Sequence, residues 1–250
     1  MRILQSLWGK KARSRSSKDQ AVTSANDSVR YAYIHIGKTG ETSVGKLSKK
    51  ANDAGYETPK ALGHDTQLNK ASADFPNALF SFTIRDPIER MISAFDSRMR
   101  QSRPAYTALW KTEEAVCYLW FPTSFDFFKA LLSEDEREKS AGLFALHNLG
   151  HIRRGYRYHF GSVASLRSLR NRIYYIGELE AGSAAHMGYF EPTGVPDEFL
   201  ETNQIHAHSG GGSTTSSKLM VPVTMQTELK DYFSEEYEVY EELKRIAKEQ

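Results

Sequence analysis

Short apolar runs recur along the chain. The clearest are residues 30–36 (RYAYIHI), 78–84 (ALFSFTI) and 172–177 (RIYYIG), with a shorter extended piece at 60–65 (KALGHD). Runs of this length, rich in β-branched and aromatic residues, are typical of strands covered on both faces. We therefore predict a buried sheet built from these segments.

Helical spacing of apolar residues predominates elsewhere. It predicts helices over about 42–54, from 86 onward, from 123 or 124, over 136–151, over 162–170, and from 224 onward with a break near 234. The second helix has a strong start signal, because Asp86 suits the N-cap, Pro87 the first helical position and Glu89 the acid of a capping box. The alternation predicts an α/β fold, a single domain over 29–250 with one parallel sheet flanked by helices. Residues 1–28 lack periodicity, and we predict a disordered tail there.

Composition narrows the class of protein. The chain has 250 residues, 40% of them hydrophobic and 26% charged, which is typical of a globular protein. A net charge of only +2 argues against a nucleic-acid-binding protein. Cys117 is the single cysteine, so we expect a small buried side chain rather than a disulfide or a multi-cysteine zinc site. The chain has no apolar run long enough for a membrane span or a secretory signal, and we expect a cytoplasmic protein.

Charge is distributed unevenly along the chain. Residues 140–177 contain arginines and no acid, whereas the last 25 residues are rich in glutamate. The basic segment suits an anionic ligand or substrate. The alternative is that these arginines lie on solvated helix faces.

The segment IHIGKTGETS is the most informative. A strand that ends in a glycine-rich turn and opens a helix forms an anion site, because unpaired N–H groups and the helix dipole face the ligand. Gly37 and Gly40 permit close approach of an oxyanion, and Lys38 adds a positive charge. The hydroxyl donors of this segment are those of Thr39, Thr42 and Ser43.

A nucleoside-triphosphate loop fits this turn poorly. That motif has the pattern G-x-x-x-x-G-K-[ST], but its first glycine position holds Ala32 here, and residues 33–36 are predicted to be strand. A nucleotide-dependent kinase or other phosphotransferase therefore stays a weaker alternative. So does an accidental strand-turn-helix with a solvated lysine.

A second motif follows the strand at 78–84. Arg85 ends this strand, and Ser93 stands eight residues later on the capped helix, about 12 Å along its axis. The two side chains can hold one object only if it lies along the helix flank, as a second phosphate would. The alternatives are that Arg85 pairs with Asp86 or Glu89 and that Ser93 is a surface hydroxyl.

Together the two motifs resemble a known family. A strand ending in His-Ile-x-Lys-Thr-Gly-x-Thr-Ser, followed by a strand ending in Arg-Asp-Pro-x-x-Arg with Ser eight residues after the first Arg, is similar to the carbohydrate sulfotransferases that include heparan sulfate 2-O-sulfotransferase. The likeness covers about residues 31–97 and is weaker at 173–180. It implies the P-loop NTPase-like sulfotransferase fold. It also implies transfer of a sulfuryl group from 3′-phosphoadenosine 5′-phosphosulfate (PAPS) to a hydroxyl, of a carbohydrate or glycoconjugate, without a metal.

The resemblance also implies roles for individual residues. Lys38 would contact the 5′-phosphosulfate and its bridging oxygen, and Arg85 and Ser93 would hold the 3′-phosphate. His64 would be the catalytic base, which its ordinary pKa of about 6.5 suits. The residues that would surround the 5′-phosphate, mostly through backbone N–H groups, are Gly37, Thr39, Gly40, Glu41, Thr42 and Ser43.

Two departures from the family pattern matter. The family has Pro where this chain has Gly37, and Gly or Ala where it has Glu41. A carboxylate beside a phosphosulfate is repulsive, so we expect Glu41 to contribute only its backbone, and a non-catalytic nucleotide-binding module stays an alternative. His147 and His151, four residues apart, are predicted to share a helix face. Either they line an acceptor cleft together with Arg153 and Arg154 or, less favourably, they are zinc ligands. Acceptor recognition is expected within 98–170, and residues 209–218 (SGGGSTTSSK) are predicted to be a flexible loop.

Overall fold

The computed structural model describes residues 26–104, 106–203 and 221–250 of the chain. Most of the predicted tail at 1–28 and all of the predicted loop at 209–218 lie outside these residues.

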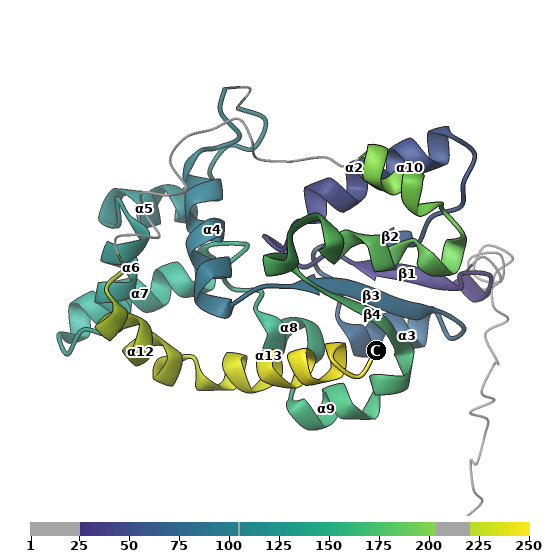
Figure 1. The fold of residues 1–250 in the computed structure, drawn as a ribbon. Helices are drawn as coiled ribbons and strands as arrows, with labels where there is room; N and C mark the ends of the chain where they lie inside the picture. The colour runs from purple at the N-terminus through teal and green to yellow at the C-terminus, as the bar shows by residue number, and fades with distance from the viewer. Residues whose placement is uncertain (1–25, 105, 204–220) are drawn as a thin grey trace, which may run out of the picture.

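Four parallel strands form one sheet in the order β2-β1-β3-β4 (Figure 1). The strands are β1 (Tyr31–Ile34), β2 (Lys60–Leu62), β3 (Leu79–Ile84) and β4 (Ile173–Glu178). The prediction of an α/β fold with a parallel sheet is therefore confirmed. The first strand is shorter than predicted, because the Ile36 N–H turns back to the Ile34 carbonyl at 3.1 Å and takes the chain out of the sheet. His35 and Ile36 thus belong to the turn.

Helices cover both faces of the sheet, as Figure 1 shows. One face packs against α3 (Leu68–Asp74), α8 (Tyr156–Phe160), α9 (Val163–Ser168) and α13 (Ser234–Ala247), around a core that includes Phe80 and Phe82. The other face packs against α2 (Glu41–Asp53), α10 (Asp197–Thr202) and the 3-10 segment η2 (Leu179–Tyr189), with Tyr33 at the centre. Two short 3-10 turns, η1 (Arg170–Arg172) and η3 (Glu191–Thr193), complete this part.

A second group of helices extends from the carboxyl edge of the sheet. It consists of α4 (Pro87–Met99), α5 (Thr112–Trp120), α6 (Ser124–Leu131), α7 (Glu136–Asn148) and α12 (Val223–Tyr232). Phe95, Phe127 and Cys117 lie fully buried in its core, so Cys117 is the small buried side chain that was predicted. Among the described residues no helix is both long and apolar enough to cross a membrane.

The ends of two helices test the sequence signals. Asp86 caps α4 as predicted, since its side chain accepts from the N–H groups of Ile88 and Glu89. The Glu89 side chain, however, faces Arg85 and not the cap. The predicted shared helix face of His147 and His151 is wrong, because α7 ends at Asn148.

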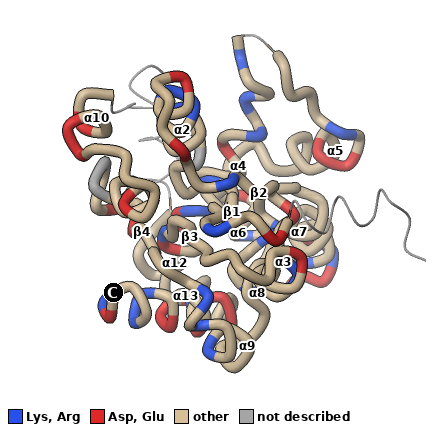
Figure 2. The backbone as a smooth tube through the Cα atoms, turned by 90° about the vertical axis from the view of Figure 1, so that its right-hand side faces the viewer, with Lys and Arg blue, Asp and Glu red and all other residues tan. Residues whose placement is uncertain are grey.

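The basic and acidic segments meet in the fold, as the mixed blue and red stretches near α9 and α13 show (Figure 2). The ion pairs join Arg157 to Glu235, Arg167 to Glu242 and Arg170 to Glu249. Hydrogen bonds from Arg167 and Arg245 lower the pKa of Glu242 to about 2. These arginines therefore bind the C-terminal helix, which favours the structural interpretation over an anionic ligand for this part of the basic segment.

Candidate anion-binding site

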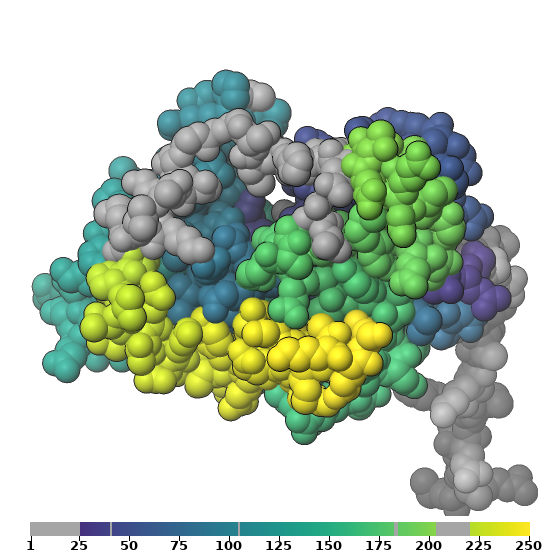
Figure 3. Space-filling model, in the orientation of Figure 1, coloured from purple at the N-terminus to yellow at the C-terminus, as the bar shows by residue number. Residues whose placement is uncertain are grey.

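Three predicted site segments follow the carboxyl ends of neighbouring strands. The turn with Lys38 follows β1, His64 follows β2, and Arg85 follows β3. Because Ile34 of β1 pairs with Leu62 of β2, the two strands end at the same level. The sheet order places the turn between the other two segments. Ligands of open parallel sheets bind at this edge, and the surface is hollowed between α4 and η2 (Figure 3).

The turn leads directly into α2. Gly40 stands at the N-cap with φ of 90°, without a side-chain cap, and Ser43 N–H donates to its carbonyl at 3.0 Å. The first N–H groups of α2, those of Glu41 and Thr42, therefore lie at an uncapped helix start, where the dipole favours an anion. Lys38 has φ of 72°. A left-handed residue other than glycine costs about 1–2 kcal/mol and is characteristic of functional turns.

Lys38 joins this turn to α4. Its Nζ donates to Ser97 Oγ at 3.1 Å. Glu89, Ser93 and Ser97 are spaced by four residues, so they follow one flank of α4, and Arg85 stands four residues before Glu89, just ahead of the N-cap Asp86. Ser93 stands one turn, about 6 Å, from the serine that meets Lys38. Sequence reasoning missed Ser97, although this four-residue spacing is visible in the sequence.

Arg85 is held mainly through its backbone. The buried Tyr156 hydroxyl accepts from the Arg85 N–H at 2.8 Å and donates to the Arg85 carbonyl at 2.5 Å. Burial raises the pKa of Tyr156, so this hydroxyl keeps its proton. The guanidinium approaches Glu89 at 3.5 Å, longer than the 2.7–2.9 Å or so of a strong charge-assisted bond. The predicted alternative of an Arg85–Glu89 pair is thus present, but weak.

His64 lies between two other imidazoles. Its ring centroid is 3.8 Å from that of His35 and 5.2 Å from that of His151. His151 was predicted only as a candidate for an acceptor cleft or a zinc site, and His35 only as a residue of the first strand. His35 comes from the turn after β1, and His151 from the segment between α7 and α8. The cluster therefore brings His64 to the same turn as Lys38.

The loop that carries His64 is anchored from α8 and the segment before it. Arg154 forms an ion pair with Asp65, and the Tyr158 hydroxyl donates to the Asp65 carbonyl at 3.2 Å. The His159 Nδ1 lies 2.7 Å from the Thr66 carbonyl. Burial lowers the pKa of His159 to about 4, so the ring is neutral and Nδ1–H donates to that carbonyl. Arg154, Tyr158 and His159, all within the segment 98–170, therefore anchor the loop that carries His64.

Two details of the turn differ from expectation. A Cβ on Gly37 would stand 2.7 Å from His151 Nδ1, and one on Gly40 would stand 2.8 Å from His186 and Leu179. Both glycines therefore let neighbouring side chains close onto the turn, which is a packing role beside the one predicted. Thr39 is fully buried, and its hydroxyl donates to the Ile36 carbonyl at 2.8 Å. Its side chain thus stabilises the turn and does not present a donor to the surface.

Arg90 connects the two halves of the site. It is 1% exposed, its Nη1 donates to the His151 carbonyl at 2.8 Å, and its guanidinium lies over the Tyr156 ring at 5.8 Å. No carboxylate of the described residues forms an ion pair with it. Its charge therefore adds to the positive potential between the histidine segment and the backbone of Arg85.

The chemistry of this site comes from one full cation in the turn, an uncapped helix start, an arginine and serines on a helix flank, and an imidazole cluster. The described residues contain no group of three or more His, Cys, Asp or Glu side chains arranged to hold a metal ion. Comparisons with protein-family models, with curated proteins and with solved structures give no match for this chain.

Proposed function

We propose that this chain is a sulfotransferase that uses PAPS as donor and sulfates a hydroxyl of a carbohydrate or glycoconjugate, in the cytoplasm. One observation carries the proposal. The Lys38–Ser97 contact sets the turn of the first motif against the helix flank of the second, which supports the proposal that one ligand with two phosphate groups binds both motifs.

The donor fits the residues present. The start of α2 and Lys38 suit a 5′-phosphosulfate. Arg85 and Ser93, which lie nearer the start of α4 than Ser97, suit a 3′-phosphate. A nucleotide with phosphates at both positions uses both sets of donors, whereas a triphosphate chain at the turn leaves Arg85 and Ser93 unused.

Each residue then has a defined task. In the reaction the acceptor oxygen bonds to sulfur, the bond from sulfur to the bridging oxygen breaks, and 3′-phosphoadenosine 5′-phosphate leaves. Lys38 stabilises the charge that grows on the leaving phosphate oxygen. His64 takes the proton of the acceptor hydroxyl. Its position beside His35 and His151 keeps its ring in a fixed place at the turn.

Kinase chemistry has less support. Ala32, at the first glycine position of a nucleoside-triphosphate loop, is fully buried inside β1. The Thr39 hydroxyl, which that loop would offer to Mg²⁺, is buried and donates to the Ile36 carbonyl. The kinase hypothesis is therefore weaker than the sulfotransferase proposal.

A thermal-shift titration tests the donor. A ligand at about 100 times its dissociation constant adds about 2.7 kcal/mol of stability, a rise of about 5–10 °C for a chain of this size. We expect this rise with 3′-phosphoadenosine 5′-phosphate, a smaller one with adenosine 5′-phosphate, and none with ATP and magnesium. Arg85→Ala should remove the difference between the first two, while the exposed Arg137→Ala should keep it.

A rise with ATP and magnesium alone would overturn the proposal in favour of a phosphotransferase. Tight binding of PAPS without sulfate transfer to any of a panel of carbohydrate hydroxyls would favour a non-catalytic nucleotide-binding module.

A further inference from the structure

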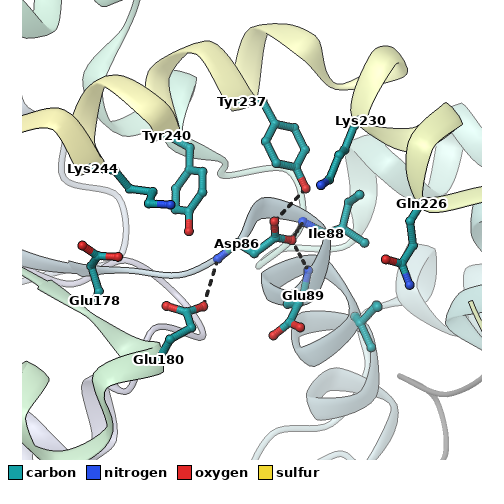
Figure 4. Close-up of a pocket in the computed structure, with 11 residues that line it drawn as sticks. Asp86, Ile88, Glu89, Glu178, Glu180, Gln226, Lys230, Tyr237, Tyr240 and Lys244 are labelled. Carbon is teal, nitrogen blue, oxygen red and sulfur yellow. Dashed lines mark hydrogen bonds between the residues drawn. The ribbon is translucent and has the colours of Figure 1, made fainter. Parts of the chain in front are cut away.

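A cavity lies between the start of α4, the end of β4, and helices α12 and α13 (Figure 4). Its volume is about 390 Å³. Four carboxylates and two amines line it, those of Asp86, Glu89, Glu178, Glu180, Lys230 and Lys244. A pocket of this size accommodates a small organic molecule, and acids outnumber bases in its wall.

Most of these charged groups already have partners. Asp86 caps α4 and accepts from the Tyr237 hydroxyl at 2.9 Å, and Glu180 accepts from the Asp86 N–H at 3.3 Å. Glu89 lies near Arg85. Among the described residues the half-buried Glu178 carboxylate has neither a hydrogen bond nor an ion pair. Glu178 therefore has a negative charge available to a ligand.

Tyr240 adds an independent observation. The side chain is only 6% exposed, yet its hydroxyl points into the cavity and makes no hydrogen bond with any described residue (Figure 4). Burial raises the pKa of Tyr240, and so do the charges of Glu180, Asp86 and Glu178. The potential at the hydroxyl is therefore negative, and its oxygen, which opens onto the cavity, is available to accept a hydrogen bond from a ligand.

The lysines do not reverse this potential. Lys244 Nζ lies over the Tyr240 ring at 5.5 Å, and Lys230 Nζ lies over the Tyr237 ring at 5.7 Å. Both amines are thus placed on aromatic faces at the sides of the cavity. They show that the tyrosine rings accept cations here.

We propose that this cavity is a binding site for a small organic cation that carries a primary ammonium group. The ammonium donates to the Glu178 carboxylate and to the Tyr240 hydroxyl oxygen, which accepts. The aliphatic part of the ligand lies against the ring of Tyr237. A buried ammonium needs both a countercharge and hydrogen-bond acceptors, and this wall supplies the two together. The site does not depend on the function proposed for the turn.

Titration calorimetry with 1,4-diaminobutane tests this site in the full-length chain at low salt. We expect saturable binding with one site and a dissociation constant below about 1 mM, which corresponds to about 4 kcal/mol. Neutral 1,4-butanediol and inorganic phosphate should not bind there. The absence of saturable binding of the diamine, or stronger binding of phosphate in this cavity, would overturn the proposal.

Two variants locate the binding. Glu178→Gln and Tyr240→Phe should each weaken diamine binding at least fivefold, while the exposed Glu198→Gln on α10 should leave it unchanged. Tyr240→Phe keeps the ring and removes a hydroxyl without a partner, so its melting temperature should not fall. Diamine binding of unchanged strength in both cavity variants would show that the cation binds elsewhere and would refute the assignment.

Discussion

Two candidate sites of opposite charge share the carboxyl edge of the sheet and the start of α4. The candidate anion-binding site contains Lys38, Arg85 and the start of α2, whereas the cavity presents the carboxylates of Asp86 and Glu178. Arg85 and Asp86 are neighbours in the chain, yet Asp86 lines the cavity and Arg85 belongs to the other site. Where β3 passes into α4, two adjacent residues of opposite charge thus belong to two different candidate sites.

The two sites also differ in origin. The first is centred on a continuous strand, turn and helix, β1 to α2, to which Arg85, Ser97 and the imidazole cluster are added from other segments. The second collects side chains from β4, α4 and α13, which are distant in sequence. Variants that affect one site and spare the other therefore test this separation.

The largest effect is expected at His64. His64→Ala removes the general base, and such groups contribute about 10²- to 10⁴-fold to rate. Sulfate transfer from PAPS to a carbohydrate acceptor should fall by this factor, while calorimetric affinity for 3′-phosphoadenosine 5′-phosphate stays the same. The matched control is the exposed His147→Ala. Undiminished transfer would show that another group takes the proton.

Lys38→Ala should separate the two sites most clearly. A hydrogen bond to a charged group contributes about 1.5–3 kcal/mol, so affinity for the bisphosphate should fall about 10- to 100-fold. Affinity for 1,4-diaminobutane should not change, because Lys38 does not line the cavity. Calorimetry with both ligands measures this, with Lys50→Ala as control. A parallel loss of both affinities would contradict the separation.

Low pH should lower the stability of the fold through His159, whose ring anchors the loop that carries His64. The folded pKa of about 4 lies below the ordinary 6.5, so between these values the unfolded chain binds more protons and stability falls as pH falls. From pH 7.5 to pH 5 this amounts to about 2 kcal/mol. Urea unfolding at the two pH values should show the loss in the parent chain and in His147→Gln. His159→Gln should be less stable than the parent chain at pH 7.5, but its free energy of unfolding should fall less between pH 7.5 and pH 5. An equal fall in the variant and the parent chain would show that His159 does not cause the pH dependence.

Tyr156→Phe tests whether the position of Arg85 decides the preference for a 3′-phosphate. Without the hydroxyl, the Arg85 N–H and carbonyl lose their partner, at a cost of about 1–3 kcal/mol in stability. The preference for 3′-phosphoadenosine 5′-phosphate over adenosine 5′-phosphate should fall about tenfold, as measured by competition binding. The exposed Tyr232→Phe on α12 is the control. An equal loss for both nucleotides would indicate a general structural role instead.

The smallest effect is expected at Glu89, which lies between the sites. Its contact with Arg85 is long and partly exposed, and such pairs contribute less than about 1 kcal/mol. Glu89→Gln should raise bisphosphate affinity about two- to threefold and lower diamine affinity by a similar factor. Calorimetric titrations at two salt concentrations would measure both. A change of the same sign for the two ligands would show that Glu89 does not separate them.

Much of the fold follows from local sequence signals. The apolar runs at 78–84 and 172–177 correspond to β3 and β4, and the Asp86-Pro87 start of α4 was predicted from the sequence. The short helices α3, α8 and α10 were not predicted, since a segment of five to seven residues has too few turns to show a periodicity. The end of α7 at Asn148 was also missed, although Gly150, two residues later, is a residue type that commonly ends a helix.

The sequence by itself determined the strand, turn and helix around Lys38 and the capped start of α4, because those structures depend on hydrogen bonds and steric preferences of adjacent residues. Only the tertiary structure decided which side chains from distant segments contact them. The imidazoles on both sides of His64, the Tyr156 contacts with Arg85, the Lys38–Ser97 contact and the cavity beside Tyr240 join segments far apart in the chain. Such contacts arise when separate apolar faces are buried against each other, and no local pattern specifies which polar groups then meet.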